Sequence, residues 1–184
     1  MEKYKEDKKI RCKKGRVRRT FYAAAALVYC ILFAWFITKN TQLLECISDS
    51  LQGIRYILVL KTSTFKHGDI VAIKDHPVSY VKETSFAKRV LGLPGDRIFK
   101  SKGCLSLLTG GEIGKKGKSI VTLTQLPLLE TTREGKPLTP LSIESVPHGY
   151  VFVIGDNPRS FDSRYEEFGL VAREKIFGRG IFTW

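Results

Sequence analysis

The sequence predicts a mainly β protein, with a single N-terminal transmembrane helix followed by an all-β domain of curved antiparallel sheets. Short runs rich in β-branched and aromatic residues recur from residue 54 to the end, and Gly, Pro and Asp separate them. A long uncharged stretch precedes these runs, and no amphipathic helical pattern follows it. Many short strands punctuated by turn residues are typical of all-β domains.

The first 37 residues combine a basic segment with an apolar one. Residues 1–20 carry ten lysines and arginines against three acidic residues, and residues 21–37 carry no charge, which is close to the shortest length for a spanning helix. The apolar run ends in Trp35-Phe36-Ile37 without a small-residue cleavage site, which favours an uncleaved anchor over a signal peptide. Because basic flanks stay in the cytoplasm, we expect a cytoplasmic segment (1–20), an inner-membrane anchor (21–37) and an extracytoplasmic, periplasmic domain (38–184).

The net charge of +13 does not predict a nucleic-acid-binding protein. More than half of it falls on residues 1–20, where membrane topology and anionic lipid account for it. The sequence has neither basic-aromatic repeats nor Cys/His spacings typical of zinc sites. We therefore expect inner-membrane lipid as a partner, and no nucleic acid, metal or cofactor.

The four cysteines leave one question open. Cys12 and Cys30 fall before and within the expected span, whereas Cys46 and Cys104 fall in the outer domain. An oxidising compartment would permit a disulfide between the last two, but spacing alone does not decide whether their Cα atoms approach closely enough. A Cys46–Cys104 disulfide and two free thiols therefore both remain open.

Seven segments of the outer domain have the composition and punctuation of strands. They are Ile54–Leu60, Ile70–Lys74, Ser85–Leu91, Arg97–Lys100, Ser119–Leu123, Tyr150–Ile154 and Ile176–Thr183. The stretch Gly103–Lys118 is rich in glycine and lysine, and we expect a flexible hairpin or loop there. Residues 101–147 as a whole are expected to form a variable loop region.

The residues on either side of Lys88 in the sequence predict a lysine with a lowered pKa. Period-2 alternation in the strand Ser85–Leu91 places Phe86, Lys88 and Val90 on one face. Partial desolvation between two apolar side chains lowers the pKa of a lysine, which makes it a candidate general base. To be neutral near pH 7 its pKa must fall by about 3 units, or roughly 4 kcal/mol. The alternative is a lysine whose amine simply reaches water.

Three segments carry the candidate chemistry. They are Ser48–Gly53 (SDSLQG), Lys88–Asp96 (KRVLGLPGD) and Gly155–Tyr165 (GDNPRSFDSRY). In this order behind an N-terminal span, they resemble the bacterial type I signal peptidases, which are membrane-anchored serine proteases with a serine–lysine dyad. The resemblance covers nearly the whole chain except about 101–147. Where the family has a proline shortly after the nucleophile, this chain has Gln52-Gly53, which leaves the backbone path after the serine open.

The resemblance implies a role for each matching residue. Ser50 is the nucleophile and Lys88 its general base. Ser48 matches the position whose hydroxyl helps the Ser50 amide to stabilise the oxyanion, and Ser160 matches a serine that orients the lysine amine. Two structural charged pairs complete the match: Asp156 with Arg89, and Asp162 with Arg164.

A histidine base is not predicted. His67 and His148 fall beside turns and His76 precedes a proline, and none belongs to a pattern typical of a Ser-His-Asp triad. We therefore expect all three on the surface. A buried neutral lysine activates a serine hydroxyl without a histidine.

The resemblance implies a membrane-anchored serine endopeptidase that removes signal peptides from exported preproteins, whose side chains before the cut are small. The compact domain and the segment Ser50–Tyr56 also resemble the conjugative-transfer peptidases that mature a pilin. A prepilin is therefore a second candidate substrate, with hydrolysis or cyclisation of the product left open. The alternative from another class is a non-catalytic membrane-anchored scaffold of a secretion or pilus apparatus, which the altered serine segment would permit.

Overall fold

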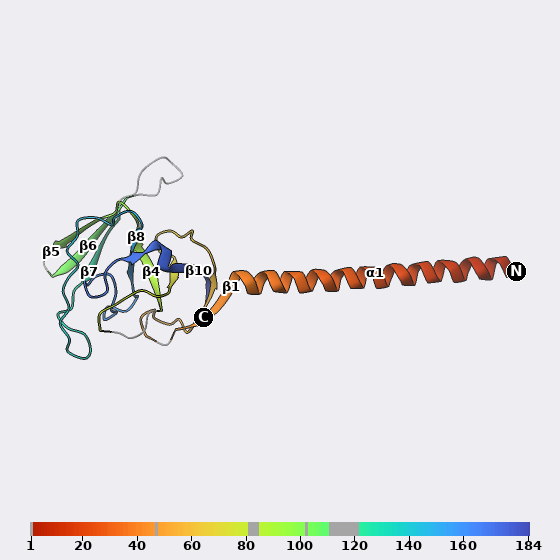
Figure 1. Cartoon of the computed structure of the whole chain (residues 1–184), viewed down its shortest axis with the longest axis horizontal. Coiled ribbons are helices and arrows are strands. Elements are labelled where there is room, and N and C mark those ends of the chain that lie inside the picture. Colours follow the sequence, from red (N-terminus) through yellow and green to blue (C-terminus); the bar gives the residue numbers. More distant parts are fainter. Residues whose placement is uncertain (1, 47, 81–84, 102, 111–121) are drawn as a thin grey trace. The chain divides into compact units, whose positions relative to one another are not determined.

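The computed structural model of the protein describes residues 2–46, 48–80, 85–101, 103–110 and 122–184. The chain divides into a helical unit, Met1–Thr41, and a β-rich unit, Gln42–Trp184 (Figure 1).

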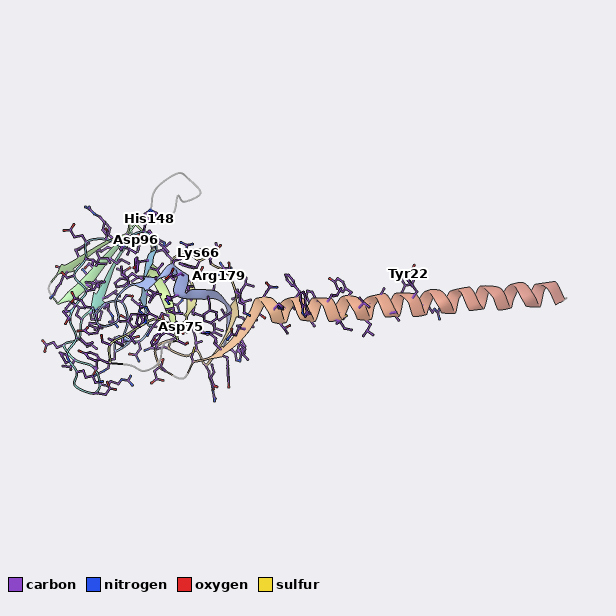
Figure 2. The ribbon with its side chains drawn as sticks, viewed as in Figure 1. Tyr22, Lys66, Asp75, Asp96, His148 and Arg179 are labelled. Carbon is purple, nitrogen blue, oxygen red and sulfur yellow. The ribbon has the colours of Figure 1, made fainter. Side chains whose placement is uncertain are left out.

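Helix α1 (Glu2–Asn40) is continuous over 39 residues. Lysine, arginine and glutamate favour helix, so the basic segment continues the helix of the apolar run. The part Phe21–Asn40 is long and apolar enough to cross a membrane, by length and composition alone. Its apolar side chains, Tyr22 among them, point outward from the helix (Figure 2). At the C-terminal end, side chains satisfy two helix carbonyls: Asn40 donates to Phe36 O at 2.8 Å and Thr41 donates to Ile37 O at 2.8 Å.

The β-rich unit holds two sheets of mainly antiparallel strands (Figure 1). The larger sheet has the strand order β1-β2-β10-β3-β4-β8-β9. Its strands are β1 (Thr41–Glu45), β2 (Tyr56–Leu60), β3 (Ile70–Ile73), β4 (Phe86–Gly92), β8 (Tyr150–Ile154), β9 (Val171–Ala172) and β10 (Ile176–Thr183). A 3₁₀ turn, Arg173–Lys175, connects the last two. The smaller sheet has the order β5-β6-β7, from β5 (Arg97–Ser101), β6 (Cys104–Thr109) and β7 (Thr122–Pro127).

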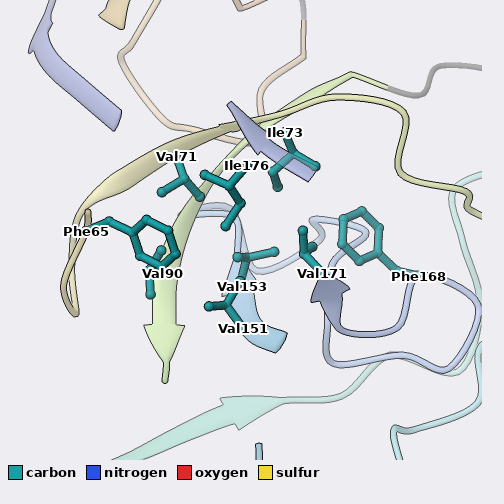
Figure 3. Packing of buried hydrophobic residues seen from close by; sticks show 9 residues of the cluster. All are labelled: Phe65, Val71, Ile73, Val90, Val151, Val153, Phe168, Val171 and Ile176. Atoms are coloured by element: carbon teal, nitrogen blue, oxygen red, sulfur yellow. The ribbon is translucent and has the colours of Figure 1, made fainter. Parts of the chain in front are cut away.

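Both faces of the larger sheet are covered by apolar side chains. Strand β3 shows this, because all four of its residues are buried and alternate ones join different clusters. Val71 and Ile73 belong to a cluster with Val90, Val153 and other residues of β4, β8, β9 and β10 (Figure 3). Ile70 and Ala72 belong to a second cluster, which also contains residues of β2. A third cluster joins the two sheets.

The fold class predicted from the sequence is confirmed, and one apolar segment before the β strands is long enough to span a membrane. Of the hairpin or loop predicted over Gly103–Lys118, Cys104–Thr109 is a strand, the middle one of the small sheet, and it pairs with β7 as one arm of a hairpin. Leu105 and Leu107 alternate there and bury against Phe152 of β8, and this tertiary contact outweighs the glycine-rich composition. Residues 111–121 of this region lie outside the described residues.

Other strand boundaries also differ from the expectation. The strand expected over Ser119–Leu123 is β7, which starts at Thr122 and runs on to Pro127, while residues 119–121 lie outside the described part. The two strands β1 and β9 were not predicted. Strand β9 has only two residues, and two residues show no periodicity.

Candidate active site

Strand β4 holds Lys88 in the interior of the β-rich unit. The strand is central, paired with β3 on one side and with β8 on the other, and Lys88 lies opposite Val71. Alternation buries Lys88 and Val90, whereas Arg89 between them is partly exposed. Lys88 is only 4% exposed, and its amine lies 5.9 Å from the centre of the Phe168 ring. The amine is therefore largely removed from water.

Ser50 lies on a turn that its neighbour Leu51 anchors. Leu51 is 2% exposed and packs with Ile57 and Val59 of β2. Ile54 N donates to Leu51 O at 3.4 Å, and Gly53 adopts a φ of +73°, which glycine reaches without steric cost. Gln52-Gly53 thus forms a turn where the family has its proline, and the buried leucine sets the position of Ser50.

The Lys88 amine bridges two serine hydroxyls. Its Nζ lies 2.6 Å from Ser50 Oγ and 2.8 Å from Ser160 Oγ, and the two hydroxyl oxygens are 3.3 Å apart. Burial lowers the pKa of Lys88 to about 8, against opposition from the negative charge of Asp162 and with a smaller contribution from Arg164. A substantial fraction of this amine is therefore neutral at mildly alkaline pH and able to accept a proton.

A buried ion pair holds Ser160 in place. Asp162 and Arg164 are 0% and 2% exposed, and their side chains join through Nε–Oδ1 at 2.8 Å and Nη2–Oδ2 at 3.0 Å. Burial alone would lower the pKa of Arg164, but the hydrogen bonds and charge of Asp162 leave it raised. The guanidinium also donates to three carbonyl oxygens: Ser160 at 2.8 Å, Pro158 at 3.0 Å and Pro127 at 2.9 Å. These bonds close the loop 155–164 on itself and tie it to the end of β7.

Gly155 lets this loop approach the Ser50 turn. A Cβ at Gly155 would lie 2.7 Å from the Ser50 carbonyl oxygen and would overlap the side chain of Ser160. Its amide donates to Asp162 Oδ2 at 3.0 Å, and Asn157 N donates to Ser50 O at 3.3 Å. The close approach requires a residue without a side chain. The sequence contains this signal only as a glycine at the end of an expected strand.

The second charged pair lies nearer to solvent. Arg89 donates to both carboxylate oxygens of Asp156 at 2.8 Å, and the side chains are 33% and 25% exposed. The hydrogen bonds to Asp156 raise the pKa of Arg89. Arg89 also donates to Gly68 O at 2.9 Å, so the pair links the loop 155–164 to β4 and to the turn before β3.

Ser50 and Lys88 border a groove of about 640 Å³. Its apolar walls come from β1, β3, β4 and the start of β10, and include Leu44, Cys46, Ile73, Phe86, Ala87 and Phe177. Ser48 is exposed and also lines the groove, and its hydroxyl has no hydrogen-bond partner among the described residues. The structure therefore brings Ser50, Lys88 and Ser160 into contact, and it places Ser48 on the same groove as Ser50 and Lys88.

The histidine expectation is wrong for His76. It is 5% exposed, its ring packs against Phe168 and Phe86, and Nε2 lies 2.9 Å from Phe168 O. Burial of the ring lowers the pKa of His76. His67 is half-buried, and its Nε2 lies 2.6 Å from Asp96 Oδ2. His148 is exposed, which agrees with the expectation.

The question about the cysteines has an answer in this structure. Cys46 and Cys104 are both free. Cys46 lines the groove, whereas Cys104 begins β6 in the other sheet.

The chain matches known proteins over most of its length. The family model of signal peptidase, peptidase S26, matches residues 15–184. Signal peptidase I of Bacillus licheniformis is 28% identical over 167 residues, which cover 87% of this chain and 81% of that protein. Signal peptidase I U of Bacillus subtilis is 30% identical over 158 residues, covering 84% and 78%. A crystal structure of a signal peptidase I from Enterococcus faecalis, 28% identical, covers 63% of this chain and 96% of that chain with a TM-score of 0.37.

Proposed function

The chain belongs to the signal peptidase family, peptidase S26, and we propose that Ser50 and Lys88 form the catalytic dyad of this serine protease. The observation that carries the proposal is the contact of 2.6 Å between Lys88 Nζ and Ser50 Oγ. It joins a buried amine of lowered pKa to a hydroxyl at the edge of an open groove. A weak nucleophile becomes reactive when a positioned base takes its proton.

In this mechanism the neutral Lys88 amine removes the proton from Ser50 Oγ as that oxygen attacks the carbonyl carbon of the cleaved peptide bond. The protonated amine then gives its proton to the departing nitrogen, and the acyl group stays on Ser50. Lys88 next takes a proton from water as the water oxygen attacks the acyl carbon, and it returns that proton to Ser50 Oγ when the acyl bond breaks. Ser160 orients the amine throughout, because its hydroxyl lies 2.8 Å from Nζ.

We place Ser48 in the oxyanion hole. Its hydroxyl is unpartnered among the described residues and lies in the same groove as Ser50, so it is free to donate to the developing oxyanion beside the Ser50 amide. The pair Asp162–Arg164 positions Ser160 in this proposal, and Arg89–Asp156 secures the loop from its exposed side.

The substrates in this proposal are exported preproteins. The apolar groove beside Ser50 supports the binding of an extended segment before the cut, and the resemblance implies small side chains there. We propose that the segment 21–37 anchors the protein in the inner membrane, with 1–20 in the cytoplasm and 38–184 outside. Tethering raises the effective concentration of the enzyme where signal peptides emerge from the bilayer.

A dedicated substrate, a prepilin of a conjugative transfer system, is the narrower form of the proposal. The small size of the second sheet, with three strands, favours a compact enzyme of this kind. Digestion of a panel of preproteins and prepilins, with products read by mass spectrometry, separates the two forms. Cleavage of the prepilin alone supports the dedicated role, and a cyclic product identifies an amine as the acyl acceptor. Cleavage of the general preproteins at equal rates contradicts the dedicated role.

The test of the dyad uses the full chain in detergent. Ser50→Ala should abolish cleavage while membrane insertion persists, because only the attacking oxygen is lost. Ser48→Ala should reduce the rate by about 10²–10³-fold. Ser142→Ala, an exposed serine outside the groove, is the matched control and should cleave at the wild-type rate. Cleavage by Ser50→Ala at the wild-type rate would refute the assignment, and the scaffold alternative forecasts no cleavage by any form.

A further inference from the structure

A second cleft is lined by Ser160, which does not line the groove. Its volume is about 170 Å³, and Arg159, Ser160 and Phe161 form one of its walls. The same Ser160 contacts Lys88 and Ser50 through its Oγ. A single residue thus separates this cleft from the reacting hydroxyl.

The cleft has an ordered aromatic wall. Tyr80 and Phe161 stack with ring centres 6.3 Å apart and planes at 29°, and Phe161 in turn meets the edge of Phe168. On the opposite side Thr132 Oγ1 accepts from the amides of Glu134 and Lys136 at 3.2 Å each, which closes a tight turn. Hydrogen bonds and stacked rings therefore hold both sides of the cleft.

The charges at the cleft are mostly positive. Arg133 and Arg159 are exposed and line it, and within the described part of the chain neither forms an ion pair. Lys136 lies beside the cleft, with its amine 5.1 Å from the centre of the Tyr80 ring and bonded to Tyr80 O at 3.3 Å. Glu134 is the acidic residue that lines the cleft. Asn157 Oδ1 accepts from Arg159 N at 2.9 Å and so orders the backbone at this arginine.

We propose that this cleft binds the residues that follow the cleaved bond and favours an acidic side chain among the first three of them. The inference rests on the proposed function, in which Ser50 attacks a chain bound in the groove. Ser160 lines the cleft and touches Ser50, so the cleft lies within one residue of the reacting hydroxyl, and it offers a bound chain an aromatic wall and two arginines. Guanidinium groups bind carboxylates through paired hydrogen bonds. Because both arginines are exposed to water, we expect only a modest preference for an acidic side chain.

The experiment uses substrates that are identical up to the cut and carry Glu, Gln or Lys at each of the first three positions after it. For the full chain in detergent, kcat/KM should fall from Glu to Gln to Lys, with about a fivefold difference between the extremes at one position. The difference should shrink as salt is added, because salt screens exposed charges.

The double variant Arg133→Glu/Arg159→Glu should reverse this order, so that kcat/KM rises from Glu to Gln to Lys. Arg97→Glu, which changes an exposed arginine of β5 outside the groove and the cleft, is the matched control and should keep the wild-type order. Equal rates on all three substrates, or an unchanged order in the double variant, would overturn the cleft proposal and leave the dyad intact. Failure of the wild type to cut any substrate would overturn both.

Discussion

Strand β4 and the loop 155–164 each bury one cationic side chain, and the two cations have opposite surroundings. Lys88 is 4% exposed and bonds to two neutral hydroxyls, whereas Arg164 is 2% exposed and bonds to the carboxylate of Asp162. Burial lowers the pKa of Lys88 to about 8, while Asp162 leaves the pKa of Arg164 raised. Both side chains are desolvated, but Lys88 can act as a base, whereas Arg164 keeps its charge because Asp162 is its partner.

The difference shows how the site separates reactivity from structure. A buried charge with a hydrogen-bonded counter-ion stays charged and fixes the groups around it, and Arg164 in this way holds three carbonyl oxygens of the loop and of β7. A buried amine without a counter-ion in contact is costly when protonated, so it readily gives up its proton. The rigid loop fixes the position of Ser160, and Ser160 in turn orients Lys88.

The largest effect should come from replacing the Lys88 amine with a guanidinium, the group that Arg164 carries. Lys88→Arg should reduce kcat/KM by about 10⁴-fold, because a guanidinium stays protonated and cannot accept the serine proton. Cleavage of a preprotein in detergent measures this loss. Lys61→Arg, a lysine at the rim of the same groove, is the control and should keep nearly full activity. Substantial activity of Lys88→Arg would mean that another group is the base.

Removing the counter-ion of Arg164 should mainly affect stability. Asp162→Asn leaves a buried guanidinium without a negative partner, and the new amide group faces another N–H donor, Gly155 N or Arg164. We expect a loss of about 3–5 kcal/mol in the free energy of unfolding. Denaturant titration followed by near-UV circular dichroism measures it. A variant as stable as the wild type would show that Asp162 does not hold the loop.

Removing the amine of Lys88 should stabilise the protein, and by an amount that depends on pH. The pKa is about 8 in the folded chain and 10.5 in the unfolded one, so protonation below pH 8 favours the unfolded state by roughly 3 kcal/mol. This penalty fades as the pH rises from 8 to 10.5. The stability advantage of Lys88→Met over the wild type should therefore shrink by about 2 kcal/mol between pH 7 and pH 9.5. Thermal unfolding at the two pH values tests this, and a constant difference would contradict a lowered pKa.

The smallest effect should follow from breaking the exposed pair. Asp156→Asn is the matched change to Asp162→Asn, but Arg89 and Asp156 are 33% and 25% exposed, so water takes over part of their interaction. We expect a loss of about 1 kcal/mol or less. The same denaturant titration measures both variants. Equal losses would mean that burial does not distinguish the two pairs.

Alternating apolar residues and turn residues in the sequence predicted many of the strands. Strand β8 has the bounds expected from its sequence, Tyr150–Ile154, because valines and aromatic residues between turn residues favour a strand. Strand β6 was missed, because the burial of Leu105 and Leu107 depends on Phe152, which is distant in the chain. His76 was misplaced for the same reason, since its stacking on Phe168 joins segments that only the tertiary fold brings together.

The sequence by itself determined the class of the protein, the apolar helix before the β strands, and which side chains were candidates for the site. It also indicated that Lys88 shares a face with Phe86 and Val90, because alternation along a strand is a local property. Only the tertiary structure decided the distances among Ser50, Lys88 and Ser160, which come from three separate segments. It likewise decided that the expected pair Asp162–Arg164 is fully buried and that Lys88 is only 4% exposed. A pKa depends on burial and on the charges that lie nearby in space, and the sequence alone specifies neither of them.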